Sequence, residues 1–351
     1  MTDLTYERFS LPLAEPLGTS QGTIRDRSGY VVRYDHRGHT GVGEATPLPG
    51  WTETLSACED GLAAAAAAEP EGGHTGALLA LAADEVPAAR HGFATALLDA
   101  DARADGVPLY QWFDEERDCR SVPVNATVGD AGPTETARDV AEAVDAGFDC
   151  CKLKVGARTL SADLDRLRAV RERVGDGVTL RADANGVWDR ETAAEAVEAF
   201  ADYGVAYVEQ PLPAEDLAGH ADLRGGPVGI ALDESLIEHR VDTVIDADAA
   251  DVLILKPMVV GGPGNAHTLA LRARERGIEP VVTTTIDGVV ARLAALHVAA
   301  AIPGIAPCGL ATGDRLAGDL APDPTTLADG TLSVPQTDGL GVDPGEVATD
   351  A

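Results

Sequence analysis

The spacing of apolar and polar residues changes once along the chain. Residues from about 4 to 45 alternate in the way that predicts strands joined by turns. Two Ala-rich stretches follow, Thr52 to about Ala68 and Pro87–Gly106, and predict helices. Because strands come first and helices second, residues 1–120 are expected to form an N-terminal α+β capping domain.

From Ser121 onward, short β-prone runs alternate with helical segments of roughly 10–15 residues, the signature of repeated βαβ units. The candidate strands are VPVNATV, CCKLKV, VTLRAD, VAYVE, VGIALD, DVLILK, PVVTTTI and CGLAT. They predict an α/β fold, a (β/α) TIM-like barrel over residues 121–314. The segment 315–351, rich in Asp, Pro and Gly, is expected to return to the capping domain and complete it.

The composition narrows the setting in which such a protein works. A net charge of −31, with 58 acidic and 27 basic residues, argues against nucleic acid and anionic membranes as partners. Because the acidic residues are spread along periodic segments, we expect a salt-adapted surface of a halophilic protein. No basic and apolar leader and no run of roughly 18 apolar residues is present, so a cytoplasmic location is expected. The five cysteines form no CxxC pair and are expected to be buried thiols.

Lysine is almost absent from this chain. Only three of the 27 basic residues are lysine, namely Lys152, Lys154 and Lys256. Chance retention on the surface explains this poorly, since all three lie in strand-like apolar runs. Lysine, unlike arginine, can give up its proton when its surroundings change. The pattern therefore favours a catalytic role for these lysines.

Charged residues also mark the ends of successive predicted strands. They are Lys154, Asp183, Glu209, Asp233 and Lys256, separated by 29, 26, 24 and 23 residues. One βα unit between neighbours places all five at the C-terminal mouth of one barrel, where active sites of this fold are built. Any one of the acids alone would more simply be a solvated loop residue, but the joint pattern is unlikely by chance.

The acids and the lysines suggest complementary roles. Asp183, Glu209 and Asp233 cannot all stay ionised at close range without a cation, and oxygen-only ligands favour Mg²⁺, with Mn²⁺ as an alternative. Such a metal would bind a substrate carboxylate and stabilise the enediolate formed on loss of the α-proton. Lys152 and Lys154 face the same way on one strand, so each should lower the pKa of the other. Lys154 and Lys256 would approach the α-carbon from opposite sides, either as base, acid or electrostatic partner.

Short motifs at these positions resemble the enolase superfamily, specifically its lysine-pair, muconate-lactonizing-like branch. They are K-L-K at 152–154, D-A-N at 183–185, E-Q-P at 209–211, D-E-S at 233–235 and K-P at 256–257. The resemblance extends to residues 87–110 in the first domain. Lysine bases and Mg²⁺-stabilised enediolates are known chemistry of that superfamily. The resemblance therefore implies a metal-dependent enzyme acting on a small carboxylate.

Within that branch the chain resembles the o-succinylbenzoate synthase family. The segments concerned are GVGEATPLPGWTET (41–54), TTTID (283–287) and GLAT (309–312). The resemblance implies syn elimination of water from a cyclohexadiene carboxylate with a succinyl arm, a step toward menaquinone. It also implies that Lys154 removes the α-proton and then protonates the departing hydroxyl, with Lys256 against the opposite face.

Further residues receive supporting roles. Asn185 and Glu234 are expected to orient the metal-binding carboxylates. Candidates for holding the substrate are Ser20, Arg25, Thr283, Thr284 and Thr285. The three threonines could equally be strand residues without a ligand.

Other functions remain open. A racemase of N-acylamino acids or a dipeptide epimerase would use the same two lysines. Dipeptide epimerases of this branch typically carry an acidic D-x-D near strand eight, whereas this chain reads CGLATGD, with the single acid Asp314. A muconate cycloisomerase and a metal-binding barrel without turnover are more distant alternatives. A homo-oligomer is also left open.

Overall fold

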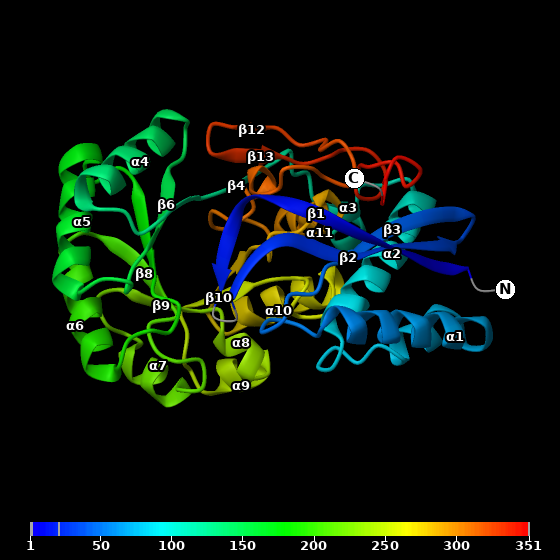
Figure 1. Ribbon diagram of the computed structural model, residues 1–351, viewed down its shortest axis with the longest axis horizontal. Helices are drawn as coiled ribbons and strands as arrows, with labels where there is room; N and C mark the ends of the chain where they lie inside the picture. The colour runs from blue at the N-terminus through cyan, green and yellow to red at the C-terminus, as the bar shows by residue number, and fades with distance from the viewer. Residues whose placement is uncertain (1–2, 20–21, 350–351) are drawn as a thin grey trace.

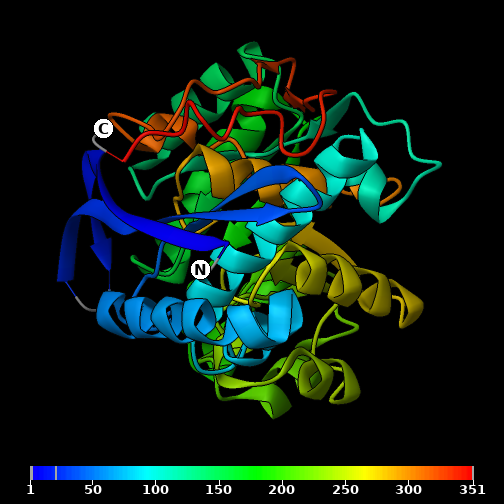
Figure 2. The same cartoon turned by 90° about the vertical axis from the view of Figure 1, so that its right-hand side faces the viewer.

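The computed structural model describes residues 3–19 and 22–349, which form a cap and a barrel side by side (Figure 1). The cap begins with an antiparallel sheet in the order β1-β2-β3, made of Leu4–Thr19, Gly22–His36 and His39–Ala45. These strands confirm the alternation predicted for the first 45 residues. Figure 2, in which the cap faces the viewer, shows its helices packed beside this sheet.

Three helices complete the first part of the chain: α1 (Leu55–Leu79), α2 (Pro87–Asp105) and α3 (Leu109–Phe113). The helix predicted to end near Ala68 continues to Leu79, with a break at Gly73, whose φ is 58°. Helix α2 packs very close to β3. A Cβ atom on Gly43 would lie 1.9 Å from the backbone oxygen of Gly92, so glycine at this position permits the contact.

The barrel contains seven parallel strands in the order β11-β10-β9-β8-β7-β6-β5. They are β5 (Ala126–Val128), β6 (Cys150–Lys154), β7 (Thr179–Asp183), β8 (Val205–Glu209), β9 (Gly229–Leu232), β10 (Val252–Leu255) and β11 (Glu279–Val282). The helices between and after them are α4 (Pro133–Asp145), α5 (Leu160–Val174), α6 (Arg190–Ala201), α7 (Leu217–Leu223), α8 (Ser235–Glu238), α9 (Val241–Asp246), α10 (Pro263–Glu275) and α11 (Val289–Ala301). This arrangement confirms the predicted α/β fold with its TIM-like barrel and strand-rich cap.

Several of the predicted barrel strands are shorter than expected, and two of these lie where the ring closes. The run 122–128 is split: β4 (Ser121–Pro123) leaves the barrel, and only β5 joins it. The predicted eighth strand is reduced to single bridges, in which Cys308 pairs with Val124 and Gly309 with Thr283. These bridges link the two edge strands, so the ring closes through one short segment rather than through a full strand.

The C-terminal segment joins the barrel to the cap. It contains a short 3₁₀ turn, η1 (Gly313–Arg315), and the strands β12 (Leu327–Ala328) and β13 (Thr331–Ser333), which pair with β4 in the order β12-β13-β4. The backbone N–H of Ala317 donates to the carbonyl of Pro12 in β1, at 2.8 Å. In Figure 1 the segment runs, orange to red, along the top of the molecule. No helix in the described residues could span a membrane, and all five cysteines are buried thiols without disulfides.

Candidate active site at the barrel mouth

Six charged side chains lie where the barrel strands end. Lys152 and Lys154 come from β6, Asp183 from β7 and Glu209 from β8, while Asp233 and Lys256 directly follow β9 and β10. Strands β6 and β10 are four positions apart in the parallel order. In a closed barrel of about eight strands, two strands that are four positions apart face each other across the mouth.

Every lysine at the mouth is paired with a carboxylate. Lys152 Nζ donates to both oxygens of Glu209, at 2.9 and 3.0 Å, and lies 3.2 Å from Asp183 Oδ2. Lys154 Nζ donates to the same Oδ2 atom of Asp183 at 2.7 Å. On the other side of the mouth, Lys256 Nζ donates to Asp233 Oδ2 at 2.6 Å. The two ammonium groups on β6 thus converge on one carboxylate.

Burial and neighbouring charges shift the pKa values of these groups in opposite directions. Burial, together with the charge of Asp183, raises the pKa of Glu209, and burial also raises that of Asp233. The pKa of Asp183 is lowered, because Lys152 and Lys154 outweigh its burial. The expected lowering of the lysine pKa is wrong for Lys152: burial acts to lower it, but Glu209 and Asp183 raise it well above its ordinary value.

The donor set suits a hard divalent cation. Asp183, Glu209 and Asp233 are almost fully buried and offer only oxygen atoms, the ligands that Mg²⁺ and Mn²⁺ prefer. Within residues 3–19 and 22–349, no three acidic, His or Cys side chains are already arranged as a metal site, because these carboxylates face lysines. Glu234 Oε2 is buried and has no hydrogen-bond partner in the described part of the chain. The residue types fit the cation, although the carboxylates would have to turn away from the ammonium groups.

Asn185 and Glu234, expected to orient the carboxylates, form a connected pair beside them. Asn185 Oδ1 accepts a hydrogen bond from Lys154 at 2.8 Å, and its Nδ2 donates to Glu234 Oε1 at 2.9 Å. The backbone N–H of Asn185 donates to Asp183 Oδ1 at 3.2 Å. Its φ of 47° lies in the left-handed region, which asparagine tolerates better than most residues. Asn185 therefore links the acid of β7 to the lysine of β6.

Gln210, to which the sequence reasoning gave no role, holds the loop that carries Asp233. Its side-chain oxygen accepts the backbone N–H groups of Asp233 and Ser235, both at 3.1 Å. Its side-chain nitrogen donates to Ser235 Oγ at 2.8 Å. The available signal was the E-Q-P motif, in which Gln210 follows Glu209 directly. Since Gln210 is fully buried, it acts by positioning its neighbours.

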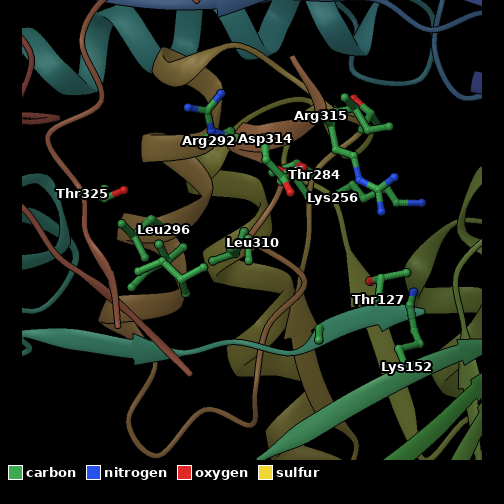
Figure 3. A pocket seen from close by; sticks show the side chains of 18 of the residues that line it. Thr127, Lys152, Lys256, Thr284, Arg292, Leu296, Leu310, Asp314, Arg315 and Thr325 are labelled. Atoms are coloured by element: carbon green, nitrogen blue, oxygen red, sulfur yellow. Dashed lines mark hydrogen bonds between the residues drawn. The ribbon is translucent and has the colours of Figure 1, made fainter. Parts of the chain in front are cut away.

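A cavity of about 880 Å³ opens above these charges (Figure 3). Lys152, Lys154 and Lys256 line it at the barrel mouth, and its other charged lining residues are Arg292, Asp314, Arg315 and Asp323. Its other walls are mostly apolar or carry hydroxyl groups, from Leu17, Leu48, Trp51, Ala126, Thr127, Phe148, Thr284, Thr285, Ile286, Leu293, Leu296, Leu310, Thr312, Leu327 and Leu332. A lysine-rich end joined to mostly apolar walls fits a small carboxylate with a larger apolar body.

Only part of the predicted substrate-binding set reaches this cavity. Thr284 and Thr285 line it, but Thr283 does not appear among the lining residues and instead donates through Oγ1 to the carbonyl of Gly309 at 2.8 Å. Arg25 lies on β2 with an exposed side chain and is likewise absent from the described lining. Ser20 lies outside the described residues. The predicted seventh strand also ends early, at Val282, so the threonines belong to the rim.

The cap contributes an aromatic contact that the sequence reasoning missed. Lys256 Nζ lies 3.3 Å from the centre of the Trp51 ring, a cation–π arrangement. Trp51 follows β3 in the segment 41–54, where only the motif had been noted. The contact brings the cap against the lysine of β10.

Comparisons with known proteins agree with this architecture. The enolase C-terminal domain-like family matches residues 135–348, and the N-terminal domain of the mandelate racemase / muconate lactonizing enzyme family matches residues 1–113. The L-Ala-D/L-Glu epimerase of Bacillus subtilis is 30% identical over 357 residues, covering 95% of this chain and 94% of that protein. An o-succinylbenzoate synthase from Thermobifida fusca is 39% identical over 223 residues, covering 62% and 68%.

A similar solved structure belongs to an enzyme with a third activity. The muconate lactonizing enzyme of Pseudomonas putida superposes with a TM-score of 0.82 at 26% identity, covering 97% of this chain and 96% of that one. These relatives share the fold and differ in the reaction that their names describe. With both domains matched over most of its length, the chain belongs to the enolase superfamily, with the N- and C-terminal domains of its mandelate racemase and muconate lactonizing enzymes.

Proposed function

We propose that this chain is an o-succinylbenzoate synthase. Lysines from β6 and β10 face each other across three carboxylates, an arrangement that suits removal of an α-proton. The observation that carries the choice of reaction is the closing segment Cys308–Thr312 beside them, which has no acid and is followed only by the single acid Asp314. An epimerase of dipeptides needs a carboxylate for the substrate ammonium, whereas the cyclohexadiene substrate of the proposed dehydratase carries no ammonium group. The cap segment 41–54 and the synthase from Thermobifida fusca add support.

The reaction would remove water from 2-succinyl-6-hydroxy-2,4-cyclohexadiene-1-carboxylate and yield o-succinylbenzoate, a step in menaquinone biosynthesis. Lys154, the more exposed of the two lysines on β6, would take the α-proton and then deliver a proton to the departing hydroxyl on the same face. Lys256 would stay protonated on the opposite face and stabilise the negative charge that develops on the substrate. The apolar walls would exclude water around the ring.

Mg²⁺, with Mn²⁺ as a substitute, is the cofactor that the donor set favours. Asp183, Glu209 and Asp233 would hold it. When bound, it would supply positive charge for the substrate carboxylate. Lys154 would act as the base beside these carboxylates.

The second candidate is a racemase of N-acylamino acids or an epimerase of dipeptides. Two features favour it: a lysine on each face of the substrate suits proton removal and return, and Asp314 lines the cavity. Asp314 is a single exposed acid rather than an acidic pair. This candidate therefore ranks second.

The setting of the enzyme is also part of the proposal. With a net charge of −31, the protein is proposed to work in a salt-rich cytoplasm, where self-repulsion is screened within roughly a few Å. The boundaries 1–120, 121–314 and 315–351 are proposed as the units of the chain.

The test is an ultraviolet assay of the folded protein in concentrated KCl with Mg²⁺, offering the cyclohexadiene substrate and following the aromatic product. Rapid conversion that EDTA abolishes and Mg²⁺ restores is the expected result. If folded protein gives no conversion but exchanges the α-proton of N-succinylamino acids with deuterated solvent, the second candidate replaces the first. Absence of both reactions would contradict both functions.

A further inference from the structure

One cation at the cavity has no partner among the residues that the structure describes. The cavity is lined by three lysines, each bound to a carboxylate, and by two arginines. Arg292 forms ion pairs with Asp319 and Asp323, at 2.8 and 2.7 Å. Within the described residues, the Arg315 side chain forms no ion pair and no hydrogen bond. Figure 3 shows Arg315 at the cavity, on the turn η1 that follows the closing segment Cys308–Thr312.

The turn that carries Arg315 is fixed on both sides. The backbone N–H of Arg315 donates to the carbonyl of Thr312 at 3.1 Å, and the hydroxyl of Thr312 lies 3.1 Å from that of Thr284, two residues beyond β11. The next residue, Leu316, forms a bridge with Leu13 of the cap. Since barrel and cap both hold this turn, the guanidinium starts from a backbone with little freedom to lose on binding.

The other cations that line the cavity already have acidic partners. The lysines at the mouth are engaged by carboxylates, and Arg292 is engaged by two more. Arg315 is therefore the cavity-lining cation that is available to an incoming anion. A guanidinium binds a carboxylate through two parallel hydrogen bonds, which an ammonium group cannot match.

We propose that Arg315 determines substrate class by binding a second carboxylate, remote from the one at the metal-binding carboxylates. The ligand class is a dicarboxylate whose two acidic groups are separated by an apolar body. This inference rests on the proposed function, in which the succinyl arm carries that second carboxylate. Asp314, the neighbouring acid, would instead favour a substrate with a remote ammonium group.

The test measures binding separately from turnover. The Mg²⁺-loaded protein is titrated with o-succinylbenzoate and with 2-butanoylbenzoate, an analogue that lacks the remote carboxylate. For the unmodified protein, we expect o-succinylbenzoate to bind about tenfold to a hundredfold more tightly. Arg315→Gln should remove most of this preference while leaving the affinity for 2-butanoylbenzoate nearly unchanged. Arg315→Lys should retain part of the preference for o-succinylbenzoate, because lysine keeps the positive charge but cannot form the two parallel hydrogen bonds of a guanidinium.

Asp314→Asn is the matched control, one residue away on the same turn, and should keep or increase the preference. Equal binding of both ligands by the unmodified protein would overturn the inference. So would an Arg315→Gln variant that loses affinity for both ligands alike, which would indicate a structural role. Because the readout is binding, it gives an answer even if the dehydration assay fails. Preference for the dicarboxylate without dehydration would contradict the proposed reaction and leave the role of Arg315 intact.

Discussion

The two sides of the barrel mouth differ in chemistry. The ends of β6 to β10, which we name the charged arc, carry Lys152, Lys154, Asp183, Glu209, Asp233 and Lys256. The ends of β11, the closing segment and β5, which we name the neutral arc, carry Thr284, Thr285, Thr312 and Thr127. In the charged arc, lysines and carboxylates fix one another. In the neutral arc, the hydroxyl groups of Thr284 and Thr312 lie 3.1 Å apart, and that of Thr285 donates to Asp287 Oδ1.

This difference separates chemistry from recognition. Removing one partner of a buried ion pair leaves an uncompensated charge and is strongly destabilising, so the charged arc tolerates little change. The neutral arc has no such constraint and can vary with the substrate. Relatives with different reactions but the same fold are consistent with this division. Each of the following changes tests one side of it.

The largest effect is expected from Lys154→Ala in the charged arc. Loss of the base should reduce kcat by about 10²–10⁴-fold, because the other lysine of β6 is bound by Glu209 and Asp183. The measurement is the rate of aromatic product formation with Mg²⁺ present. Binding of Mn²⁺, followed by electron paramagnetic resonance, should remain close to that of the unmodified protein.

The Lys256→Ala variant is compared with Lys154→Ala in turnover and in exchange of the α-proton. In a one-base dehydration this variant should slow turnover but still exchange the α-proton with deuterated solvent, since Lys154 is intact. Lys154→Ala should lose exchange as well as turnover. Full activity in Lys154→Ala would refute its assignment as the base, and equal loss of exchange in both variants would favour a two-base racemase.

The positions of the charged-arc residues could largely be predicted from the sequence, because strand spacing and alternation along a strand determine them. Strand spacing located the ends of five strands, and alternation along β6 placed Lys152 and Lys154 on one face. The structure brings these groups together. Their pairing was not predictable, since whether a lysine meets a carboxylate depends on side-chain reach and on the absence of a competing cation.

The neutral arc was harder to predict, because long-range contacts decide it. The eighth segment looks like a strand, but Cys308 and Gly309 form only bridges. Pro123 ends β4, which pairs with β13 rather than with the barrel. The contact of Trp51 with Lys256 joins residues about two hundred positions apart, and no local pattern encodes such a distance.

The next prediction concerns Glu44, a cap residue that binds the backbone at the start of α11, next to the neutral arc. Glu44, from β3 of the cap, accepts the backbone N–H groups of Gly288 and Ala291, at 2.7 and 3.0 Å, at the start of α11. Burial, together with the charge of Asp287, raises the pKa of Glu44 from 4.5 to about 7. Below about pH 4.5 this carboxyl is protonated in both the folded and the unfolded state.

Between about pH 4.5 and 7 the unfolded state loses the proton of Glu44 while the folded state keeps it, so the free energy of unfolding should fall as pH rises. The total loss above pH 7 is about 3 kcal/mol. Glu44→Gln should flatten this slope in urea denaturation at constant high KCl. Glu195→Gln, at an exposed position on α6, should leave the slope unchanged. Identical slopes in both variants would show that Glu44 does not titrate in this range.

The smallest effect is expected where the cap touches the charged arc. Trp51→Leu keeps an apolar wall but removes the ring from Lys256, which lies 3.3 Å from its centre, so kcat/KM should fall about two- to thirtyfold. The kcat/KM of Trp51→Phe should lie between those of the unmodified protein and Trp51→Leu, because a phenylalanine ring attracts a cation more weakly than a tryptophan ring. Trp112→Leu, an exposed position on α3, is the control and should not change kcat/KM. Activity in the order Trp, Phe, Leu would mean that the cap positions the lysine through its ring. Equal activity of the unmodified protein, Trp51→Phe and Trp51→Leu would mean that barrel residues alone position Lys256. The cap would then serve only to close the cavity.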